Sequence, residues 1–546
     1  MESKWIALSN TSISVFLAFL NYNMIMIALP MIFDELKFNP TSPYSLSYLL
    51  WLILGYALVT SAIVLTLGKI ADILGRVRLY NLGFLIFTIG SLLCGLVPSQ
   101  GEEGVLELII FRMIQGVGGG LLMVNGAAIL TDYFPRSELG KALGINQMFG
   151  ISGSVIGLVV GGILSSINWR LIFLVNVPIG FIGFIWSMVS LKERGVKSNT
   201  RLDIIGSILF IGSLSILLIS LSYGIVPYGG EDLGWHNPFV ISGLSISLLL
   251  LAVFFYLQTR VKNPLFDMTL FKSKTFTSAI IANFIASLAR QGISLVLILL
   301  LQAIWLPLHG YDFSETPFWA GIYLLPNVVG FAIFGPISGY LSDKYGSKIF
   351  TVLGLLLSAF GFFLLSLLPY NFDYIDFAIA TFIIGAGMGI FTSPNSADIM
   401  ASVPSDKRGV ASGMRSALQN AASTSSTAIY LSLVITGMSG PFRQSLYGTL
   451  SSLGISIQSI NVSPTQALFS ALLGYNPLSP LAQLSPSAGY ELNDPKFFSN
   501  LIAPSFIQGF RLMLYISITL LIIASLISLY RSSEKRARMG TSSKGL

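Results

Sequence analysis

Long apolar blocks constrain this chain more than any other feature of its sequence. Blocks of roughly 20–30 residues recur from end to end without strand-like alternation, and about 20 apolar helical residues cross a bilayer core. Inside hydrocarbon each segment must satisfy its own backbone hydrogen bonds, which favours helices. Only 10% of the residues are charged, too few for a water-soluble surface. We therefore predict an all-α polytopic membrane protein.

The apolar blocks predict fourteen transmembrane helices. Their approximate ranges are 6–33, 47–71, 78–98, 105–131, 140–165, 169–191, 203–224, 237–259, 275–307, 316–341, 349–369, 375–402, 409–437 and 505–530. The segment before the first span carries no small-residue cleavage site, so we interpret it as part of that span and not as a signal peptide. An even number of spans places both termini on one side.

Lysine and arginine are concentrated in the loops on one side of these spans. Outer loops hold little beyond Lys37, Arg443 and Lys496, whereas every loop on the other side carries at least two basic residues. This bias predicts a multi-pass plasma-membrane protein with both termini in the cytoplasm. The net charge of +7 then reflects topology, and we expect the lipid bilayer and no nucleic acid as a partner.

Two distant parts of the chain repeat one pattern of glycine, aspartate and proline. The matched pairs are Gly68 with Gly339, Asp72 with Asp343, Gly75 with Gly346, Gly116 with Gly385, Gly118 with Gly387, Gly120 with Gly389 and Pro135 with Pro404. The repeat predicts two six-helix bundles, at 1–195 and 266–546, joined by two linking helices at 196–265. A long outer loop is expected near 438–504. Repeated bundles with a site between them at mid-membrane are typical of secondary transporters.

Four short sequence motifs follow one another along the chain. They are Gly68–Arg78 after the second span, Arg112–Gly116 in the fourth, Trp169–Gly180 at the sixth and Leu301–Pro326 across the ninth and tenth. Together they resemble the major facilitator superfamily, in its fourteen-span drug:proton antiporter branch. The resemblance implies the major facilitator fold and a carrier that exports a small organic solute or drug by alternating access coupled to proton influx. We expect a monomer without cofactor.

Two positions depart from the pattern of that branch. Asn21 stands before Ala28-Leu29-Pro30 where an acidic residue is usual, and Leu158 stands where the antiporter motif usually has proline. The alternative is therefore an uncoupled or differently coupled carrier, a facilitator or an uptake system, for a neutral or anionic solute.

A charged turn after the second span is the candidate cytoplasmic gate. Its residues are Asp72, Gly75, Arg76 and Arg78, with Asp343 and Gly346 at the repeated position. Glycine permits the tight turn, and Asp72 can pair with Arg76 or accept from a helix N-terminus. The alternative interpretation is that these charges only fix topology.

Polar and ionisable side chains inside the spans mark a candidate cavity, because they are costly there unless they face water or a partner. The predicted substrate or coupling residues are Asn21, Asn23, Arg112, Gln115, Arg290, Gln291 and Asp398. Asp398 and Glu107 are the candidate titratable groups, with interface residues as the alternative. Arg112 could instead reach the outer headgroups, and Arg290 could belong to a structural pair. Arginines outnumber acids in the spans, which favours a neutral or anionic solute.

Glycines at four-residue spacing predict a helix face for close packing in the fifth span: Gly153, Gly157 and Gly161, with Gly162 beside them.

Other classes of protein are disfavoured. No GxxxxGK[ST] loop is present for an ATP-driven pump. The two histidines fall in or beside outer loops and Cys94 is the single cysteine, so we expect neither a metal site nor an enzyme.

Overall fold

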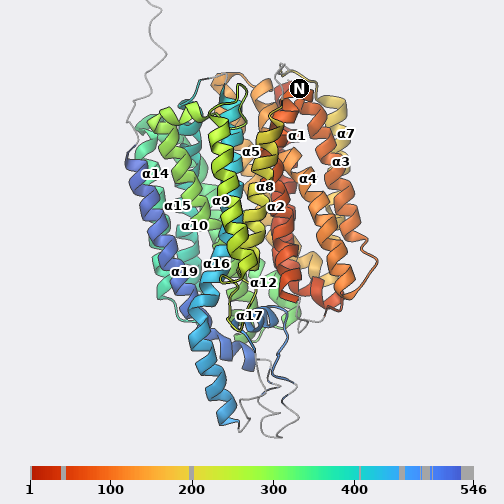
Figure 1. The fold of residues 1–546 in the computed structure, drawn as a ribbon, viewed down its shortest axis with the longest axis vertical. Coiled ribbons are helices and arrows are strands. Elements are labelled where there is room, and N and C mark those ends of the chain that lie inside the picture. Colours follow the sequence, from red (N-terminus) through yellow and green to blue (C-terminus); the bar gives the residue numbers. More distant parts are fainter. Residues whose placement is uncertain are drawn as a thin grey trace, which may run out of the picture.

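The fold was taken from a computed structural model of the chain, which is helical throughout the part described. That part comprises residues 3–38, 45–195, 202–404, 407–453, 462–479 and 496–530, with positions 481, 492 and 494. Its long helices run side by side, and α1 begins at the face where α19 ends (Figure 1). We call this end the N-terminal face and the other end the opposite face.

The helices follow the predicted spans closely. They are α1 (Ser3–Glu35), α2 (Ser45–Leu74), α3 (Arg76–Gly95), α4 (Gly101–Tyr133), α5 (Arg136–Ile167), α6 (Leu171–Leu174), α7 (Asn176–Ser190), α8 (Ile204–Tyr223), α9 (Pro238–Gln258), η1 (Met268–Lys272), α10 (Lys274–Leu299), η2 (Leu300–Trp305), α11 (Leu306–Leu308), η3 (Phe313–Glu315), α12 (Thr316–Tyr323), α13 (Leu325–Tyr345), α14 (Ser347–Leu367), α15 (Tyr374–Ala401), α16 (Arg408–Ser452), α17 (Pro464–Leu472) and α19 (Phe497–Leu529). Within the described residues, thirteen helices are long and apolar enough to cross a membrane. The 45-residue, less apolar α16 takes the place of the remaining predicted span.

The repeated glycines make the same kind of contact among helices α1–α7 and among helices α10–α19, two groups that are called the first and the second bundle below. A side chain at Gly116 would lie 2.9 Å from the Tyr56 carbonyl oxygen on α2, and Gly118 lies against the backbone of α3. In the second bundle Gly385 meets the α13 backbone, and Gly387 meets Ser358 on α14. Helices α4 and α15 therefore each wedge between the two helices that precede them, as close packing of small residues allows.

The repeated turn also has one conformation in both bundles. Gly75 and Gly346 precede α3 and α14 with φ angles of 118° and 92°. Residues with a Cβ rarely adopt this part of φ/ψ space, so glycine is required at both turns.

The glycine face of α5 lies against α1. A Cβ at Gly157 would come within 2.7 Å of the Leu20 carbonyl oxygen, and one at Gly161 within 2.7 Å of the Met24 Cα. Gly153 meets the backbone of Phe16 in the same way. The two backbones thus approach more closely than any larger residue permits.

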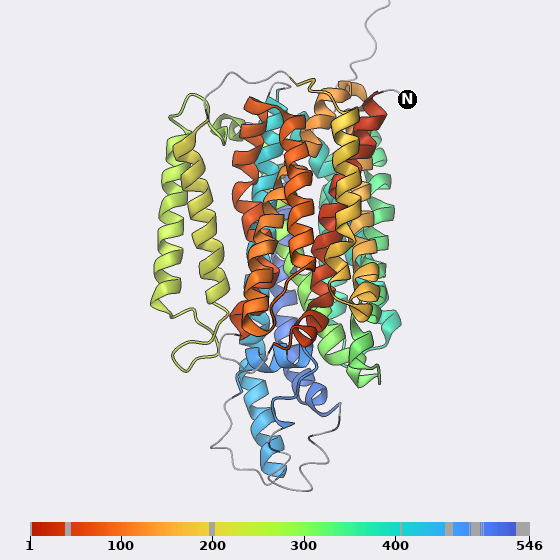
Figure 2. The same cartoon turned by 90° about the vertical axis from the view of Figure 1, so that its right-hand side faces the viewer.

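The two linking helices, α8 and α9, pack on each other and stand apart from the main body (Figure 2). Helix α8 contacts α2 and α16, one from each bundle. The turn between α8 and α9 is tied to α16, because Trp235 Nε1 donates to Ser432 Oγ at 2.7 Å and Arg443 pairs with Asp232 at 2.8 Å.

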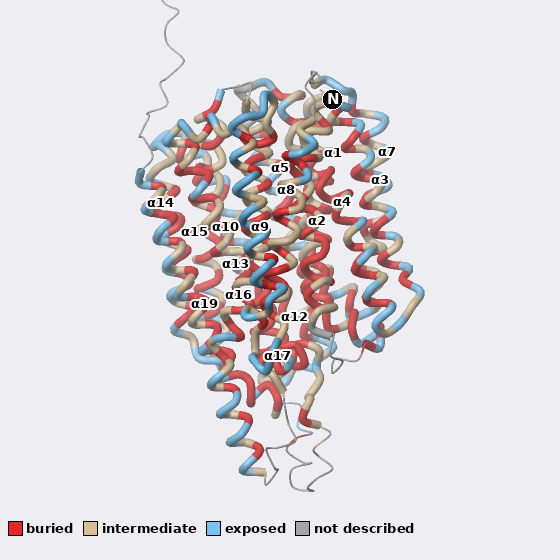
Figure 3. Tube along the Cα trace, viewed as in Figure 1, coloured by how far each residue is buried: buried red, intermediate tan, exposed pale blue. Residues whose placement is uncertain are grey.

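Whether a residue is buried depends on which face of its helix it occupies. Buried residues gather along the inner faces of the helices, and exposed ones along the outside (Figure 3). The outside includes large apolar side chains such as Val189 and Tyr340, which are 80% and 76% exposed. Exposed apolar surface of this extent suits contact with lipid.

The segment expected as an outer loop starts as helix. α16 continues to Ser452, well past the predicted end near 437, and projects from the opposite face (Figure 1). The short helix α17 then packs against α2, α16, α19 and η2. Most of 454–461 and 480–495 in the rest of this segment lies outside the described residues.

Candidate solute-binding centre and gate

Arg112 is fully buried on α4. Its Nη1 donates to Gln115 Oε1 at 3.3 Å, and its guanidinium lies 4.9 Å from the centre of the Tyr56 ring. Its Nε and Nη2 are buried without a hydrogen-bond partner among the described residues. A guanidinium carries five donor hydrogens, so most of this group's hydrogen-bonding capacity is unused.

An amide network surrounds Arg112. Asn21 on α1 and Gln115 on α4 exchange two hydrogen bonds of 3.1 Å each. Gln115 also donates to Ser91 Oγ on α3 at 2.8 Å, and Asn176 on α7 donates to Asn21 Oδ1 at 3.2 Å. Four helices of the first bundle therefore converge on one buried polar centre. Ser91 and Asn176 were not predicted, although Asn176 belongs to the Trp169–Gly180 motif.

The second bundle reaches this region through α10. Gln291 Nε2 donates to the Tyr22 hydroxyl on α1 at 3.5 Å, a contact between the bundles. Arg290 directly precedes Gln291, so this contact brings the turn of α10 that carries Arg290 up to α1. Arg290 is half-buried, and no carboxylate of the described residues forms an ion pair with it.

Three other predicted polar residues lie elsewhere. Asn23 donates to the Phe19 carbonyl at 2.9 Å, one turn back along α1. Asp398 is half-buried in the last turn of α15. Glu107, near the start of α4, accepts a 3.0 Å hydrogen bond from Ser99. The two candidate titratable groups are therefore placed at opposite ends of the bundle.

The candidate gate is an ion-pair cluster at the N-terminal face. Arg76 binds Asp72 at 2.8 Å and Asp132 at 2.6 Å, which joins the end of α2 to the end of α4. Glu193, just after α7, accepts from the backbone N–H groups of Arg76 and Val77 at 2.8 and 3.1 Å. A carboxylate at a helix N-terminus is stabilised there by the free amides and the helix dipole.

The remaining gate residues have different surroundings. Arg78 is exposed. The Asp343 side chain lies outside the described part, whereas Gly346 has the turn conformation of Gly75. Asp132 and Glu193 were not predicted as gate residues. Their partners lie 56 and 117 positions away along the chain, a separation that no local pattern reveals.

A second ion pair at this face lies within the second bundle. Lys407 Nζ contacts Asp267 Oδ2 at 2.7 Å. Burial acts to raise the pKa of Asp267, but hydrogen bonds from Lys407 and Thr269 outweigh it, so the pKa falls below its usual value. This pair holds the segment before α10 to the segment before α16.

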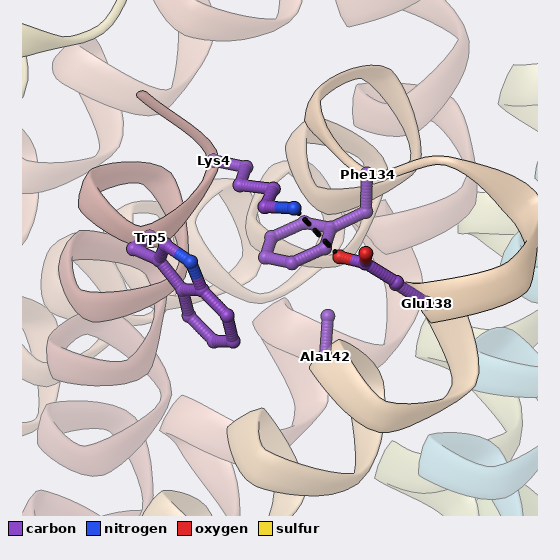
Figure 4. A pocket seen from close by; sticks show the side chains of 5 residues that line it. All are labelled: Lys4, Trp5, Phe134, Glu138 and Ala142. Atoms are coloured by element: carbon purple, nitrogen blue, oxygen red, sulfur yellow. Dashed lines mark hydrogen bonds and ion pairs between the residues drawn. The ribbon is translucent and has the colours of Figure 1, made fainter. Parts of the chain in front are cut away.

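A small cavity of about 190 Å³ opens at the N-terminal face. Lys4, Trp5, Phe134, Glu138 and Ala142 line it, and Lys4 pairs with Glu138 at 2.9 Å (Figure 4). The cavity lies between the start of α1 and the α4–α5 connection. It is separate from the Arg112 network, whose residues do not line it.

Toward the opposite face the bundles touch through small residues and backbone. A Cβ at Gly162 on α5 would lie 2.6 Å from the Phe318 Cα on α12, and one at Gly321 would lie 2.7 Å from the Leu158 carbonyl oxygen. Gln302, in the π-helical turn η2, donates to the Ile27 carbonyl of α1 at 3.2 Å. Nearer the middle, the hydroxyls of Ser61 and Thr424 meet at 3.0 Å between α2 and α16.

No group of three or more histidine, cysteine, aspartate or glutamate side chains that could hold a metal ion occurs among the described residues. The predicted absence of a metal site is not tested by that observation.

Comparison with known proteins adds to this geometry. The sequence profile described as Major Facilitator Superfamily matches residues 11–228 and 204–427. The riboflavin transporter RibZ of Clostridioides difficile is 30% identical over 439 residues, 79% of this chain and 88% of that protein. The multidrug transporter MdtP of Bacillus subtilis is 31% identical over 380 residues, 69% of this chain and 65% of that protein.

Solved structures share the fold at low identity. An inward-facing bacterial homologue of the lysosomal transporter Spinster is 17% identical, with a TM-score of 0.55 and coverage of 97% of this chain and 99% of that one. The xylose transporter XylE of E. coli is 14% identical, with a TM-score of 0.52 and coverage of 79% and 92%. At these levels of identity, the similarities to solved structures show a shared fold alone.

Proposed function

Because this chain belongs to the major facilitator superfamily and is a multi-pass carrier rather than an enzyme, we propose that it exports a small organic solute by alternating access coupled to proton influx. The relatives named as multidrug transporters support export of organic solutes. The moving parts are the bundles 1–195 and 266–546, linked by 196–265, in a monomer. The N-terminal face is cytoplasmic and the membrane is the plasma membrane, as the basic loops favour.

The contact between Tyr22 and Gln291 carries this proposal. It brings α1 and α10, one helix from each bundle, together beside the buried amide network of Asn21 and Gln115. A polar centre shared by two bundles can be opened to one face at a time when the bundles rock. The solute binds here, held by Arg112 and the amides, with Arg290 and Gln291 on the other side.

A second candidate is a carrier that is not driven by protons. The Asn21 amide takes the place at which the resembled branch has an acid, and its side chain bonds to Gln115 and Asn176. Among the described residues, no carboxylate hydrogen-bonds to the network. In this alternative the solute moves down its own gradient or with another ion.

Flux in proteoliposomes distinguishes the two candidates. Vesicles are loaded with riboflavin, which one relative's name suggests, or with the organic cation ethidium, and efflux is followed with and without an imposed pH gradient. If transport is coupled to protons, efflux should be severalfold faster when the imposed gradient drives protons in the opposite direction to the solute. Asp398→Asn or Glu107→Gln should abolish that acceleration. Identical rates with and without the gradient would favour the uncoupled carrier.

A further inference from the structure

Arg112 and Arg290 lack the partners that Arg76 and Arg511 have, and Arg415 on α16 also has a buried Nε without a partner among the described residues. Arg76 binds two carboxylates, and Arg511 on α19 donates to the carbonyls of Ser366 and Leu368 at 2.9 and 3.2 Å. Arg112 has one hydrogen bond, to a neutral amide, and two buried nitrogens with none among the described residues. Arg290 forms no ion pair with any described residue.

The fully buried Arg112 is costly to hold in the folded protein. A buried charge is stable only when an opposite charge or several hydrogen bonds replace the water it has lost. The Tyr56 ring beneath Arg112 offsets part of this cost, because the face of an aromatic ring attracts a cation. The remaining donors of Arg112 have nothing to bind among the described residues, and an anion would satisfy them.

The two arginines belong to different bundles. Arg112 lies on α4, where it donates to Gln115, which bonds to Asn21 of α1. Arg290 lies on α10 directly before Gln291, which donates to Tyr22, the next residue of α1, at 3.5 Å. A single anionic group beside Tyr22 would therefore be attracted from both sides. Its binding would hold the two bundles together, and its release would free them to separate.

We infer that Arg112 and Arg290 form a two-sided site for the carboxylate of an aromatic organic anion, which is the solute class of this carrier. The planar guanidinium fork matches a carboxylate better than any other side chain does. The Tyr56 ring beside Arg112 and the Tyr22 ring beside Gln291 favour an aromatic body. The inference rests on the proposed carrier function and narrows it to anions, whereas a lipophilic cation would be repelled.

Solutes that share one ring system and differ in one group test this inference. Purified protein is heated with 2-naphthoate, 2-naphthamide or 2-naphthylmethylammonium, and the unfolding midpoint is recorded at increasing concentration. We expect the midpoint to rise with naphthoate only. Arg112→Gln and Arg290→Gln should each weaken the apparent affinity for naphthoate by at least about tenfold, the loss of one charge-assisted contact.

Arg511→Gln is the matched control, since it also removes an arginine from a membrane helix but one that carbonyl groups already satisfy. It should keep the wild-type affinity for naphthoate. Arg290→Gln and Arg112→Lys provide further tests if Arg112→Gln does not fold, and Arg112→Lys should also weaken binding because it loses the fork. An equal rise with the amide or the ammonium, no rise with naphthoate, or wild-type affinity in both glutamine variants would overturn the site.

Flux of the same three solutes separates this inference from the carrier function. Saturable flux of the ammonium without naphthoate binding would overturn the anion site and leave the carrier function standing. Naphthoate binding without flux of any of the three would support the anion site and count against the carrier function.

Discussion

Arg76→Gln should slow solute flux by roughly 30-fold while the protein still reaches the membrane and folds. The substitution removes the cation that joins Asp72 to Asp132, whose side chains are 32% and 14% exposed. Breaking a buried ion pair costs about 3–5 kcal/mol and an exposed one about 1 kcal/mol at most, so we expect about 2 kcal/mol here. That energy converts to a roughly 30-fold shift between the two access states.

The neighbouring Arg78 is the control for this prediction, because it is exposed on the same turn. Arg78→Gln should leave flux close to the wild-type rate, and Asp72→Asn should slow it less than Arg76→Gln does. Initial rates in proteoliposomes, normalised to the amount of folded protein, make the comparison. Equal rates for Arg76→Gln and Arg78→Gln would show that the charges of this turn serve topology alone.

Gly157→Leu should abolish folding or lower the thermal unfolding midpoint more than any other substitution discussed for this chain. A Cβ at Gly157 would already lie 2.7 Å from the Leu20 carbonyl oxygen, and the larger leucine must force α5 away from α1. Overpacking a tight interior costs about 1–3 kcal/mol for a few added methylenes and more when backbone has to move.

Gly144 lies on the same helix and is the matched control. It is exposed, and a Cβ there would meet nothing within 4 Å. Gly144→Leu should therefore leave the unfolding midpoint of the detergent-solubilised protein nearly unchanged. A midpoint equally low in both variants would mean that leucine disturbs α5 itself and that the contact with α1 has no special role.

The fold was predictable because its main determinants are local. Apolar length sets each span, and repeated glycines mark the helices that wedge between their neighbours. The ends of α16 and the presence of the nine-residue α17 were harder to predict, because neither is marked by an apolar segment long enough to span a membrane. The sequence repeat also singled out Gly75 and Gly346, and both have positive φ angles.

The site was predictable only in part. Arg112 and Arg290 stand out in sequence because charge is rare inside spans. Nothing in the sequence distinguishes Ser91 and Asn176 from other polar residues, because their bonds to Gln115 and Asn21 are formed only in the fold. Asp132 and Glu193 likewise look like loop-end charges until their contacts with Arg76 are known. Asn23 was singled out by its neighbours in sequence, but its side chain bonds to its own helix.

The central claim is that the two bundles rock about the polar centre, so that opening one face closes the other. The chain suits a spin-label test, because Cys94 is its single cysteine and is buried, and Cys94→Ala supplies the background. One label pair, at Ser166 and Ser314, reports on the opposite face. Another, at Lys192 and Ala401, reports on the N-terminal face. All four positions are exposed.

Gly162→Leu supplies the perturbation, because it places a side chain where Phe318 already lies within 2.6 Å. The decisive measurement is the change in both label distances on introducing this leucine into protein held in lipid nanodiscs. Alternating access predicts that the Ser166–Ser314 distance lengthens while the Lys192–Ala401 distance shortens. A longer Ser166–Ser314 distance with an unchanged or longer Lys192–Ala401 distance would contradict it.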